Sequence, residues 1–217
     1  MQMRRTRNRP LPDGRVTTDE ARLFGLGLSA LGILLLALTS NTLSALLALA
    51  TLVIYVNVYT PLKRRSEIAT LVGAVPGALP PLIGWAASRG SLSAGGLALF
   101  AIVFLWQIPH FMAIAWLYRD DYGKAGFPML PVIDPSGRSA GRQALLYAGA
   151  LLPVSLVPLL TGTTGFVYFW LALPLGIVMV WLAWRFSRRH TEATARALFI
   201  FSIVYLPLIW IVMIADH

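Results

Sequence analysis

The sequence predicts an all-α fold, a polytopic membrane helix bundle with seven spans. Of its 217 residues, 57% are hydrophobic and only 12% are charged, whereas a soluble domain carries about 25% charged residues. The charges are concentrated in short segments between uncharged runs of about 20 residues, the length that crosses a bilayer. The chain has no cysteine, which excludes disulfides, thiolate metal sites and cysteine nucleophiles.

The spans follow one another along the chain with short connections. The connections around Asn41-Thr42 and at 162–164 are so short that the helices on either side must form antiparallel hairpins. No cleavable signal peptide is expected, because 22 mostly polar residues precede the first apolar run and that run is longer than a signal core. The seven predicted spans are roughly 23–40, 43–60, 68–87, 93–118, 143–161, 165–186 and 197–215.

The basic residues fix the predicted orientation. With these spans, 17 of the 18 lysines and arginines fall on one side and only Arg89 on the other. The positive-inside rule therefore predicts a multi-pass protein of the cell inner (plasma) membrane, with a cytoplasmic N-terminus and an external C-terminus. Because the net charge of +9 arises from these short loops, nucleic acid is not expected as a partner.

Ionisable groups are scarce within the spans, and this scarcity bears on function. No carboxylate, lysine or arginine lies deep in a predicted span, and an ion-coupled transporter normally needs such a group near the midplane. The sequence therefore argues against ion-coupled transport. His110 is the ionisable residue that lies well inside a span.

The segment 106–132 links the fold to a function. It begins in an apolar run and then breaks into adjacent carboxylates, Asp120 and Asp121. On one continuous helix, His110 and Asp121 would lie about three turns, or about 16 Å, apart on the same face, with Ile114 and Leu117 between them. This spacing predicts an apolar cavity with a polar floor and an acidic rim.

The paired carboxylates admit two interpretations. Carboxylates that face phosphates commonly hold Mg²⁺, a hard cation that keeps waters and bridges to phosphate oxygens. Alternatively, Asp120 and Asp121 belong to a solvated loop in which Arg119 and Lys124 balance their charge. Asp134 is a weaker candidate, because Asp-Pro-Ser-Gly is typical of an ordinary turn.

The span 68–87 is rich in small residues and prolines, including Gly73, Gly77 and Gly84. The first interpretation is close helix packing with a kink. The second is that a bent helix of small residues leaves room for a bulky ligand. Both can hold for the same helix.

Two further polar segments precede this span. Arginines alternate with Thr6 and Asn8 between residues 3 and 12, and they either set topology or bind phosphate oxygens in bidentate fashion. Tyr55, Tyr59, Lys63 and Arg64 end the second span and also fit an interfacial aromatic belt. Carboxylates and cations above an apolar interior suit the ionisation of a diphosphate ester with a long apolar tail.

Taken together and in order, these segments resemble the UbiA superfamily of intramembrane prenyltransferases, and within it the branch that acts on heme. The resemblance covers about residues 3 to 132. The matching motifs are Arg5-Thr6 with residues 9–12 (RPLP), Tyr59-Thr60 with residues 62–64 (LKR), residues 77–85 (GALPPLIGW), residues 106–111 (WQIPHF), and Asp121-Tyr122 through Ala125-Gly126 to residues 128–131 (PMLP).

The resemblance implies transfer of farnesyl from farnesyl diphosphate to a vinyl group of heme B, giving heme O, so that heme B is a substrate and not a cofactor. It further implies that Asp120 and Asp121 are metal ligands that hold Mg²⁺ through the diphosphate. His110 is implied to bind heme as ligand or hydrogen-bond partner; alternatively, it bonds a neighbouring helix. The implied catalytic residues are Asp121, Lys63 and Tyr59, and the implied diphosphate-binding residues are Arg5, Arg9, Lys63, Arg64 and Tyr59.

The lipid bilayer, and heme A synthase or the assembly of a terminal oxidase, are the other partners that the resemblance implies. Family members have nine spans and an Asn/Asp-rich motif ahead of the segment that matches Met3. Residues 1–217 are therefore expected to be a single prenyltransferase domain that lacks the first two helices and is inactive or impaired as written. Asp13, Asp19 and Glu20 lack the spacing to replace that motif, and Ala69 stands where an asparagine is expected.

Two alternatives to heme farnesylation remain open from the sequence. The first is another polyprenyltransferase of the same superfamily, acting on a quinone precursor. The second is a non-enzymatic heme-binding membrane protein.

Overall fold

The computed structural model describes residues 8–217, in which all regular structure is helical. Seven of its helical segments are long and apolar enough to cross a membrane, which confirms the predicted number. Arg5, a predicted diphosphate-binding residue, lies outside the described residues. The seven segments are Thr18–Thr39 (α1), Thr42–Leu62, Ala69–Arg89 (α4), Ala94–Leu117 (α5), Arg138–Leu160, Phe166–Arg189 (α10) and Glu192–Ala215 (α11).

Two of these segments are composite, and short helices connect others. The second segment comprises α2 (Thr42–Val53), a π-helical turn η1 (Ile54–Tyr59) and α3 (Thr60–Leu62). The fifth comprises α8 (Arg138–Val154) and α9 (Val157–Leu160). The short helices α6 (Arg119–Lys124) and α7 (Leu130–Ile133) lie between α5 and α8.

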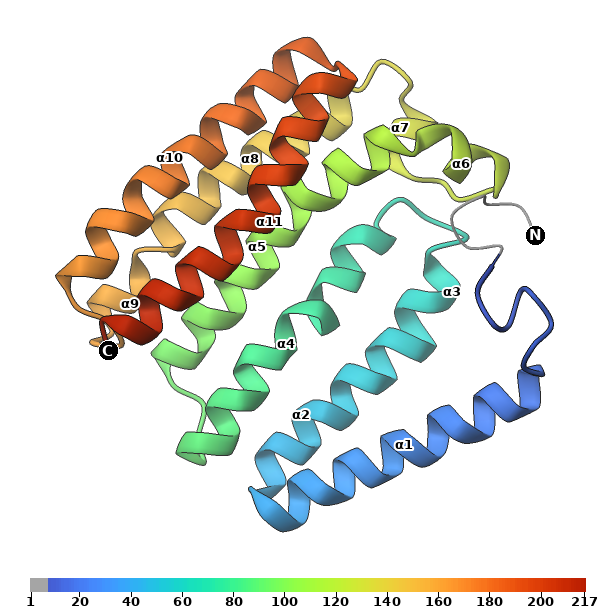
Figure 1. Ribbon diagram of the computed structural model, residues 1–217, viewed down its shortest axis with the longest axis vertical. Coiled ribbons are helices and arrows are strands. Elements are labelled where there is room, and N and C mark those ends of the chain that lie inside the picture. The colour runs from blue at the N-terminus through green and yellow to red at the C-terminus, as the bar shows by residue number, and fades with distance from the viewer. Residues whose placement is uncertain (1–7) are drawn as a thin grey trace.

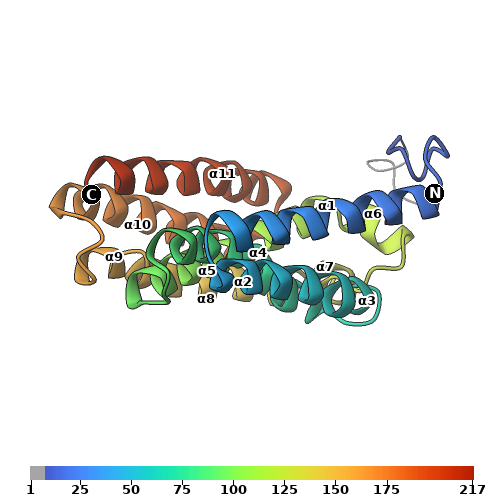
Figure 2. The same cartoon turned by 90° about the horizontal axis from the view of Figure 1, so that it is seen from below.

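The helix α5 lies at the centre of the bundle, where it packs against α4, α8 and α11 (Figure 1). The helix α10 packs on α8 and α11, α2 packs on α4, and α1 packs on α2 at the outer edge. The helices α1 and α11 stand on the same side of the layer formed by α2, α4 and α5 (Figure 2). This layer is therefore the floor of a concave face, with α1 and α11 as its walls.

The main hydrophobic core lies among α5, α8, α10 and α11, around fully buried side chains such as Met112, Leu151 and Phe186. The helix α1, in contrast, buries no residue, and its Leu23 and Phe24 are 75% and 68% exposed. Such a surface suits contact with lipid, because hydrocarbon chains solvate apolar side chains as well as a protein interior does.

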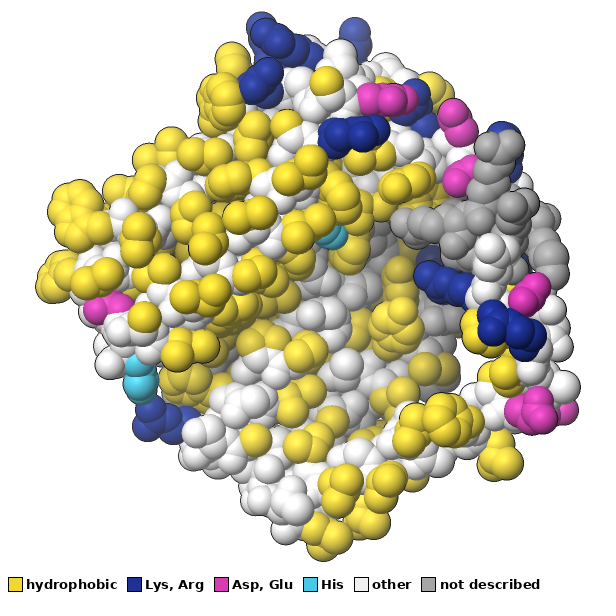
Figure 3. Space-filling view, in the orientation of Figure 1, with side chains coloured by type: hydrophobic (Ala, Val, Ile, Leu, Met, Phe, Trp, Pro, Cys, Tyr) yellow, Lys and Arg dark blue, Asp and Glu magenta, His cyan; other side chains and the backbone are white. Residues whose placement is uncertain are grey.

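The two ends of the bundle differ in charge. The N-terminal loop, α3, α6 and α7 lie at one end, and α9 and the C-terminus lie at the other (Figure 1). Lysine and arginine side chains gather along the first end, whereas a single group of basic atoms lies beside the second (Figure 3). The protein is thus a multi-pass membrane protein, while the compartment and the orientation remain predictions.

The boundary between α5 and α6 corrects one expectation. The helix α5 ends at Leu117, because Tyr118 has φ −115° and ψ 22°, and a new helix begins at Arg119. The continuous helix assumed for His110 and Asp121 is therefore wrong, and the three-turn spacing between them does not apply. The cause is the abrupt change from apolar to charged residues, which ends the membrane-spanning helix.

Candidate functional site

A cavity of about 400 Å³ opens where η1, α3, α4, α5 and the α6–α7 segment meet. We name it the tyrosine cavity, because aromatic rings dominate its wall. Lys63 is the charged residue of its lining, and its volume falls within the range of small-molecule pockets, about 300–1,000 Å³. The concave face of the molecule is visibly hollowed in this region (Figure 3). The aromatic residues are Tyr55, Tyr59, Phe111, Tyr122 and Phe127.

The π turn η1 brings Tyr55, Tyr59 and Lys63 to the same cavity. Pro61 has no backbone N–H and so cannot continue the α-helical ladder. Instead, both the N–H and the hydroxyl of Thr60 donate to the carbonyl oxygen of Tyr55, the hydroxyl at 2.8 Å. The rings of Tyr55 and Tyr59 lie 5.2 Å apart, and Lys63 Nζ lies 5.6 Å from the Tyr59 ring centroid, within cation–π range.

Glycines of α4 make room for this arrangement. A β-carbon on Gly73 would lie 2.6 Å from Tyr59 Cε2, and one on Gly77 would overlap Gln107 Oε1. Both glycines also line the tyrosine cavity. The two interpretations of this helix, close packing and room for a ligand, therefore hold at the same positions.

Gln107 is buried between α4 and α5. Its Nε2 donates to the carbonyl oxygens of Ala74 at 3.2 Å and Val103 at 3.1 Å. A buried amide with both protons satisfied holds its position firmly. Gln107 therefore forms a fixed polar point on the cavity wall.

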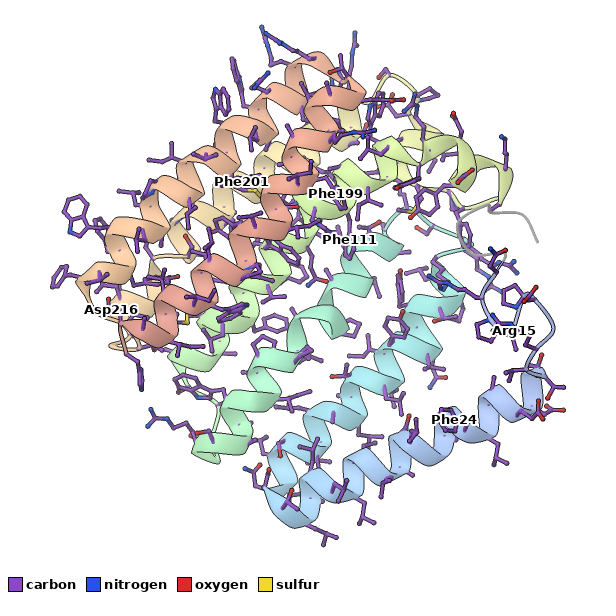
Figure 4. The ribbon with its side chains drawn as sticks, in the orientation of Figure 1. Arg15, Phe24, Phe111, Phe199, Phe201 and Asp216 are labelled. Atoms are coloured by element: carbon purple, nitrogen blue, oxygen red, sulfur yellow. The ribbon has the colours of Figure 1, made fainter. Side chains whose placement is uncertain are left out.

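A second cavity of about 370 Å³ adjoins the first and contains His110. We name it the histidine cavity; it shares Gly77, Gln107 and Phe111 with the tyrosine cavity. His110 Nδ1 lies 2.8 Å from Ser202 Oγ on α11. The His110 ring stacks on Trp106 at 4.9 Å. Phe111 and Phe199 lie near one another in the middle of the concave face (Figure 4).

The predicted acidic pair is divided between two environments. Asp120 lines a separate surface depression with Arg119 and Lys124, whereas Asp121 is half-buried beside Tyr122, which lines the tyrosine cavity. Arg119 does not balance the carboxylates of α6, since its ion-pair partner is Glu192, at 3.8 Å.

Within residues 8–217, no group of three or more His, Asp or Glu side chains could hold a metal ion by itself. A two-carboxylate set still fits Mg²⁺, which is ordinarily held by one or two carboxylates together with substrate phosphates and waters. The donor set is therefore compatible with a metal that arrives with a diphosphate.

The remaining predicted cations lie away from the cavities. Arg9 and Arg64 are exposed, and neither lines the tyrosine cavity or the histidine cavity. The structure thus brings Tyr59 and Lys63 together and leaves Arg9 and Arg64 at the surface of the same end. Asp134 forms the ordinary turn, because its carboxylate accepts from Ser136 and from the N–H of Ser139.

Sequence reasoning did not assign roles to Tyr122, Gln107 or Ser202. Tyr122 and Gln107 belong to motifs identified from the sequence, but within those motifs functional roles were assigned only to Asp121 and His110. Ser202 lies in an uninterrupted apolar run and gives no local signal, because its role arises from a contact 92 residues away along the chain.

The described residues thus form a helical membrane bundle with two adjoining, mainly apolar cavities and a lysine at one of them. This chain belongs to the UbiA prenyltransferase family, whose model matches residues 1–206. Within that family it is similar to proteins named protoheme IX farnesyltransferase. It is 48% identical to that of Solibacter usitatus, covering 100% of this chain and 74% of the relative. It is 46% identical to that of Koribacter versatilis, covering 99% and 72%.

Two solved structures share the fold. A digeranylgeranylglyceryl phosphate synthase superposes with a TM-score of 0.80 at 19% identity, covering 97% of this chain and 75% of that one. A UbiA homologue from Aeropyrum pernix K1 superposes with a TM-score of 0.63 at 20% identity, covering 94% and 78%. At these identities the comparison establishes the fold alone.

Proposed function

We propose that this protein transfers a farnesyl group from farnesyl diphosphate to a vinyl group of protoheme IX, heme B, and so forms heme O. Relatives that are 42–48% identical carry the name protoheme IX farnesyltransferase. The observation that carries the proposal is the junction of the two cavities at Gly77, Gln107 and Phe111. One cavity suits an anionic donor with an apolar chain, and the other suits a flat aromatic acceptor.

The donor is assigned to the tyrosine cavity. The Lys63 ammonium holds the diphosphate and stabilises the negative charge that develops on it as the bond between farnesyl C1 and oxygen breaks. Tyr59 and the neighbouring rings surround the apolar chain, exclude water and stabilise the cation with their faces. Arg5, Arg9 and Arg64 are assigned to the approach of the diphosphate from the same end.

Asp121, with Asp120 as its neighbour, is assigned to Mg²⁺. The ion supplies positive charge that neutralises the departing diphosphate when it is bound. The Asp121 carboxylate orients the diphosphate end of the donor toward Lys63. Asp121 is assigned the larger part in holding Mg²⁺, because it is next in sequence to Tyr122, which lines the tyrosine cavity.

The acceptor is assigned to the histidine cavity, with His110 toward the heme. Farnesyl C1 forms a bond to the terminal vinyl carbon of heme B, which leaves a cation on the adjacent carbon. Water adds to that cation and releases a proton, which gives the hydroxyethylfarnesyl group of heme O. The reaction thus consumes farnesyl diphosphate, heme B and water, and releases diphosphate and a proton.

The site of action is assigned to the inner membrane, with the lysine- and arginine-rich end cytoplasmic. The donor, a charged and water-soluble diphosphate, would then enter from the side where the basic residues gather. Association with heme A synthase or a terminal oxidase assembly, either of which would take up heme O, is part of the proposal.

The test is product formation in membranes of a host without its own heme farnesylation, expressing this gene. Extracted hemes are separated and identified by mass, with farnesyl diphosphate, heme B and Mg²⁺ supplied. Residues 1–217 are assayed beside a version extended upstream, in which we expect heme O, and in which Lys63→Ala should lower the yield at least tenfold. Farnesylation of a phenolic acceptor in place of heme would support a quinone-directed enzyme, and tight heme binding without diphosphate release would support a non-enzymatic heme-binding protein.

A further inference from the structure

Ser202 connects three groups at the seam between α5 and α11. Its side chain is fully buried, and its hydroxyl donates to the Phe199 carbonyl oxygen at 2.7 Å. His110 Nδ1 lies 2.8 Å from the same hydroxyl oxygen. The indole N–H of Trp106 donates to the Ser202 carbonyl oxygen at 2.7 Å. Trp106 and His110, one turn apart on α5, therefore both contact one serine of α11.

We infer the position of the imidazole proton from these contacts. A serine hydroxyl has a single proton, and in Ser202 that proton is donated to Phe199. The remaining contact, between Ser202 Oγ and His110 Nδ1, is then a hydrogen bond only if Nδ1 carries the proton. A neutral imidazole that donates through Nδ1 has its lone pair on Nε2.

The lone pair on Nε2 is accessible. In the described part of the chain, Nε2 of His110 has no hydrogen-bond partner and is not sealed by protein atoms, unlike Nε2 of His190, which is buried without a partner. His110 lines the histidine cavity, and its ring is flanked by Trp106 at 4.9 Å and Phe199 at 5.2 Å. Both the tautomer and the ring plane of His110 are thus held.

We propose that Ser202 is a positioning residue that holds His110 in the Nδ1–H form and so presents Nε2 as the axial ligand of the substrate's iron. The proposal rests on the proposed function in that it takes a metalloporphyrin as the occupant of the histidine cavity. A hydrogen bond to the far nitrogen of a metal-binding histidine fixes its tautomer and orientation and raises its basicity. Ligation would hold the porphyrin at a fixed depth relative to the tyrosine cavity.

The first experiment titrates ferric heme into the purified protein in lipid nanodiscs and records absorption and electron paramagnetic resonance spectra. We expect a histidine-ligated spectrum that His110→Ala abolishes and added imidazole restores. We expect Ser202→Ala to weaken heme binding by about 10–100-fold, the usual cost of losing such a partner. Ser202→Thr, which keeps the hydroxyl, should retain the histidine-ligated spectrum.

Two control variants separate positioning from general packing. Ser44 is also fully buried and donates to a carbonyl three residues back, that of Asn41 at 2.9 Å, but it contacts no histidine. Ser44→Ala should leave both heme affinity and spectrum unchanged. His217→Ala removes a histidine at the C-terminus, away from the histidine cavity, and should likewise leave heme affinity and spectrum unchanged. Equal spectra and affinities for Ser202→Ala and the unaltered protein would overturn the proposal.

A second measurement needs no heme. Nitrogen-15 chemical shifts distinguish the two imidazole tautomers, and His110 is assigned by its absence in His110→Ala. We expect the Nδ1–H form in the unaltered protein and a mixture in Ser202→Ala; the Nε2–H form in the unaltered protein would overturn the proposal. If heme O formation fails while both measurements succeed, the proposed reaction is wrong and the role of Ser202 stands.

Discussion

Gly77 lies against the side-chain amide of Gln107 so closely that a β-carbon at residue 77 would overlap Gln107 Oε1. This contact lies where the two cavities meet, and it joins α4 to α5 at the point where a donor and an acceptor would face each other. The absence of a side chain at Gly77 is therefore a requirement of packing and of the site at once.

The first prediction follows from this contact. Gly77→Ala forces Gln107 out of its hydrogen bonds with Ala74 and Val103, and overpacking of this kind costs about 1–3 kcal/mol. Thermal unfolding in detergent should show the loss. Gly84→Ala, in the same helix, meets nothing within 4 Å and should be neutral or slightly stabilising, because alanine favours helix over glycine. An equal effect of both substitutions would contradict the assigned contact.

The second prediction concerns Lys63. Lys63→Ala should weaken binding of farnesyl diphosphate by about 10–100-fold, because a hydrogen bond to a charged group contributes about 1.5–3 kcal/mol. Equilibrium binding of a radiolabelled, non-hydrolysable donor analogue measures this directly. Lys63→Arg should retain most of the affinity. Lys124→Ala, which removes an exposed cation outside the tyrosine cavity, is the control, and a larger loss there than at Lys63 would refute the placement of the diphosphate.

The third prediction separates the ring of Tyr59 from its hydroxyl. Tyr59→Phe keeps the ring that packs on Gly73 and receives Lys63, so product formation should fall less than tenfold. Tyr59→Ala should lower it by more than tenfold, because both the aromatic wall and the lysine contact disappear. The measurement is the initial rate of heme O formation in membranes. A complete loss in Tyr59→Phe would show that the hydroxyl, and not the ring, is the essential group.

The fourth prediction concerns the carboxylates of α6. Asp121→Asn should reduce the Mg²⁺-dependent part of donor binding more than Asp120→Asn, since Asp120 lines a separate depression. Donor binding is measured across a Mg²⁺ titration, with chelator as the zero point. The reverse order of the two variants would place the metal over the surface depression instead of the tyrosine cavity.

The fifth prediction uses the turn at Asp134. Hydrogen bonds from the side chain of Ser136 and from Ser139 hold the pKa of the Asp134 carboxyl well below its usual value. A depressed carboxyl pKa stabilises the fold above the unfolded pKa of about 3.9, and this contribution is lost as the pH falls through the folded pKa. Asp134→Asn should therefore lower the unfolding temperature at pH 7, and the difference should shrink in acid.

The control for this fifth prediction is Asp13→Asn. Asp13 forms an exposed ion pair at 2.9 Å with Arg15, which is labelled in the N-terminal loop in Figure 4. Pairs of this kind contribute less than about 1 kcal/mol, so the unfolding temperature should barely change. A pH-independent effect of Asp134→Asn would indicate that shape, and not charge, makes the turn.

The seven spans were predictable because each run is long, apolar and bounded by charge, so that bilayer thickness alone defines it. Residues of the site could be predicted only where their separation along the chain also brings them together in the folded protein. Lys63 and Tyr59 are four residues apart, but Pro61 between them left open whether they share a helical face. The structure shows that they do lie together, after the π turn. The alignment of His110 with Asp121 failed because the helix ends at Leu117.

Contacts between distant helices were not predictable from patterns. Ser202 in α11 and Gln107 in α5 acquire their roles from partners on other helices, and a hydrophobic period carries no information about those partners. The acidic pair illustrates the same limit, since its sequence does not reveal that Asp120 lines a surface depression while Asp121 is half-buried. Only the packing of the bundle decides which carboxylate adjoins a cavity.

Because of the π turn at Ile54–Tyr59, the number of residues in this segment determines which side chains face the tyrosine cavity. A π turn contains about one residue more than an α turn, so removing one residue from it would shift the register of the helix that follows. Everything downstream would then rotate by roughly 100°, and the ammonium of Lys63 would swing away from the cavity wall. Chain length in this segment is therefore constrained as tightly as side-chain identity.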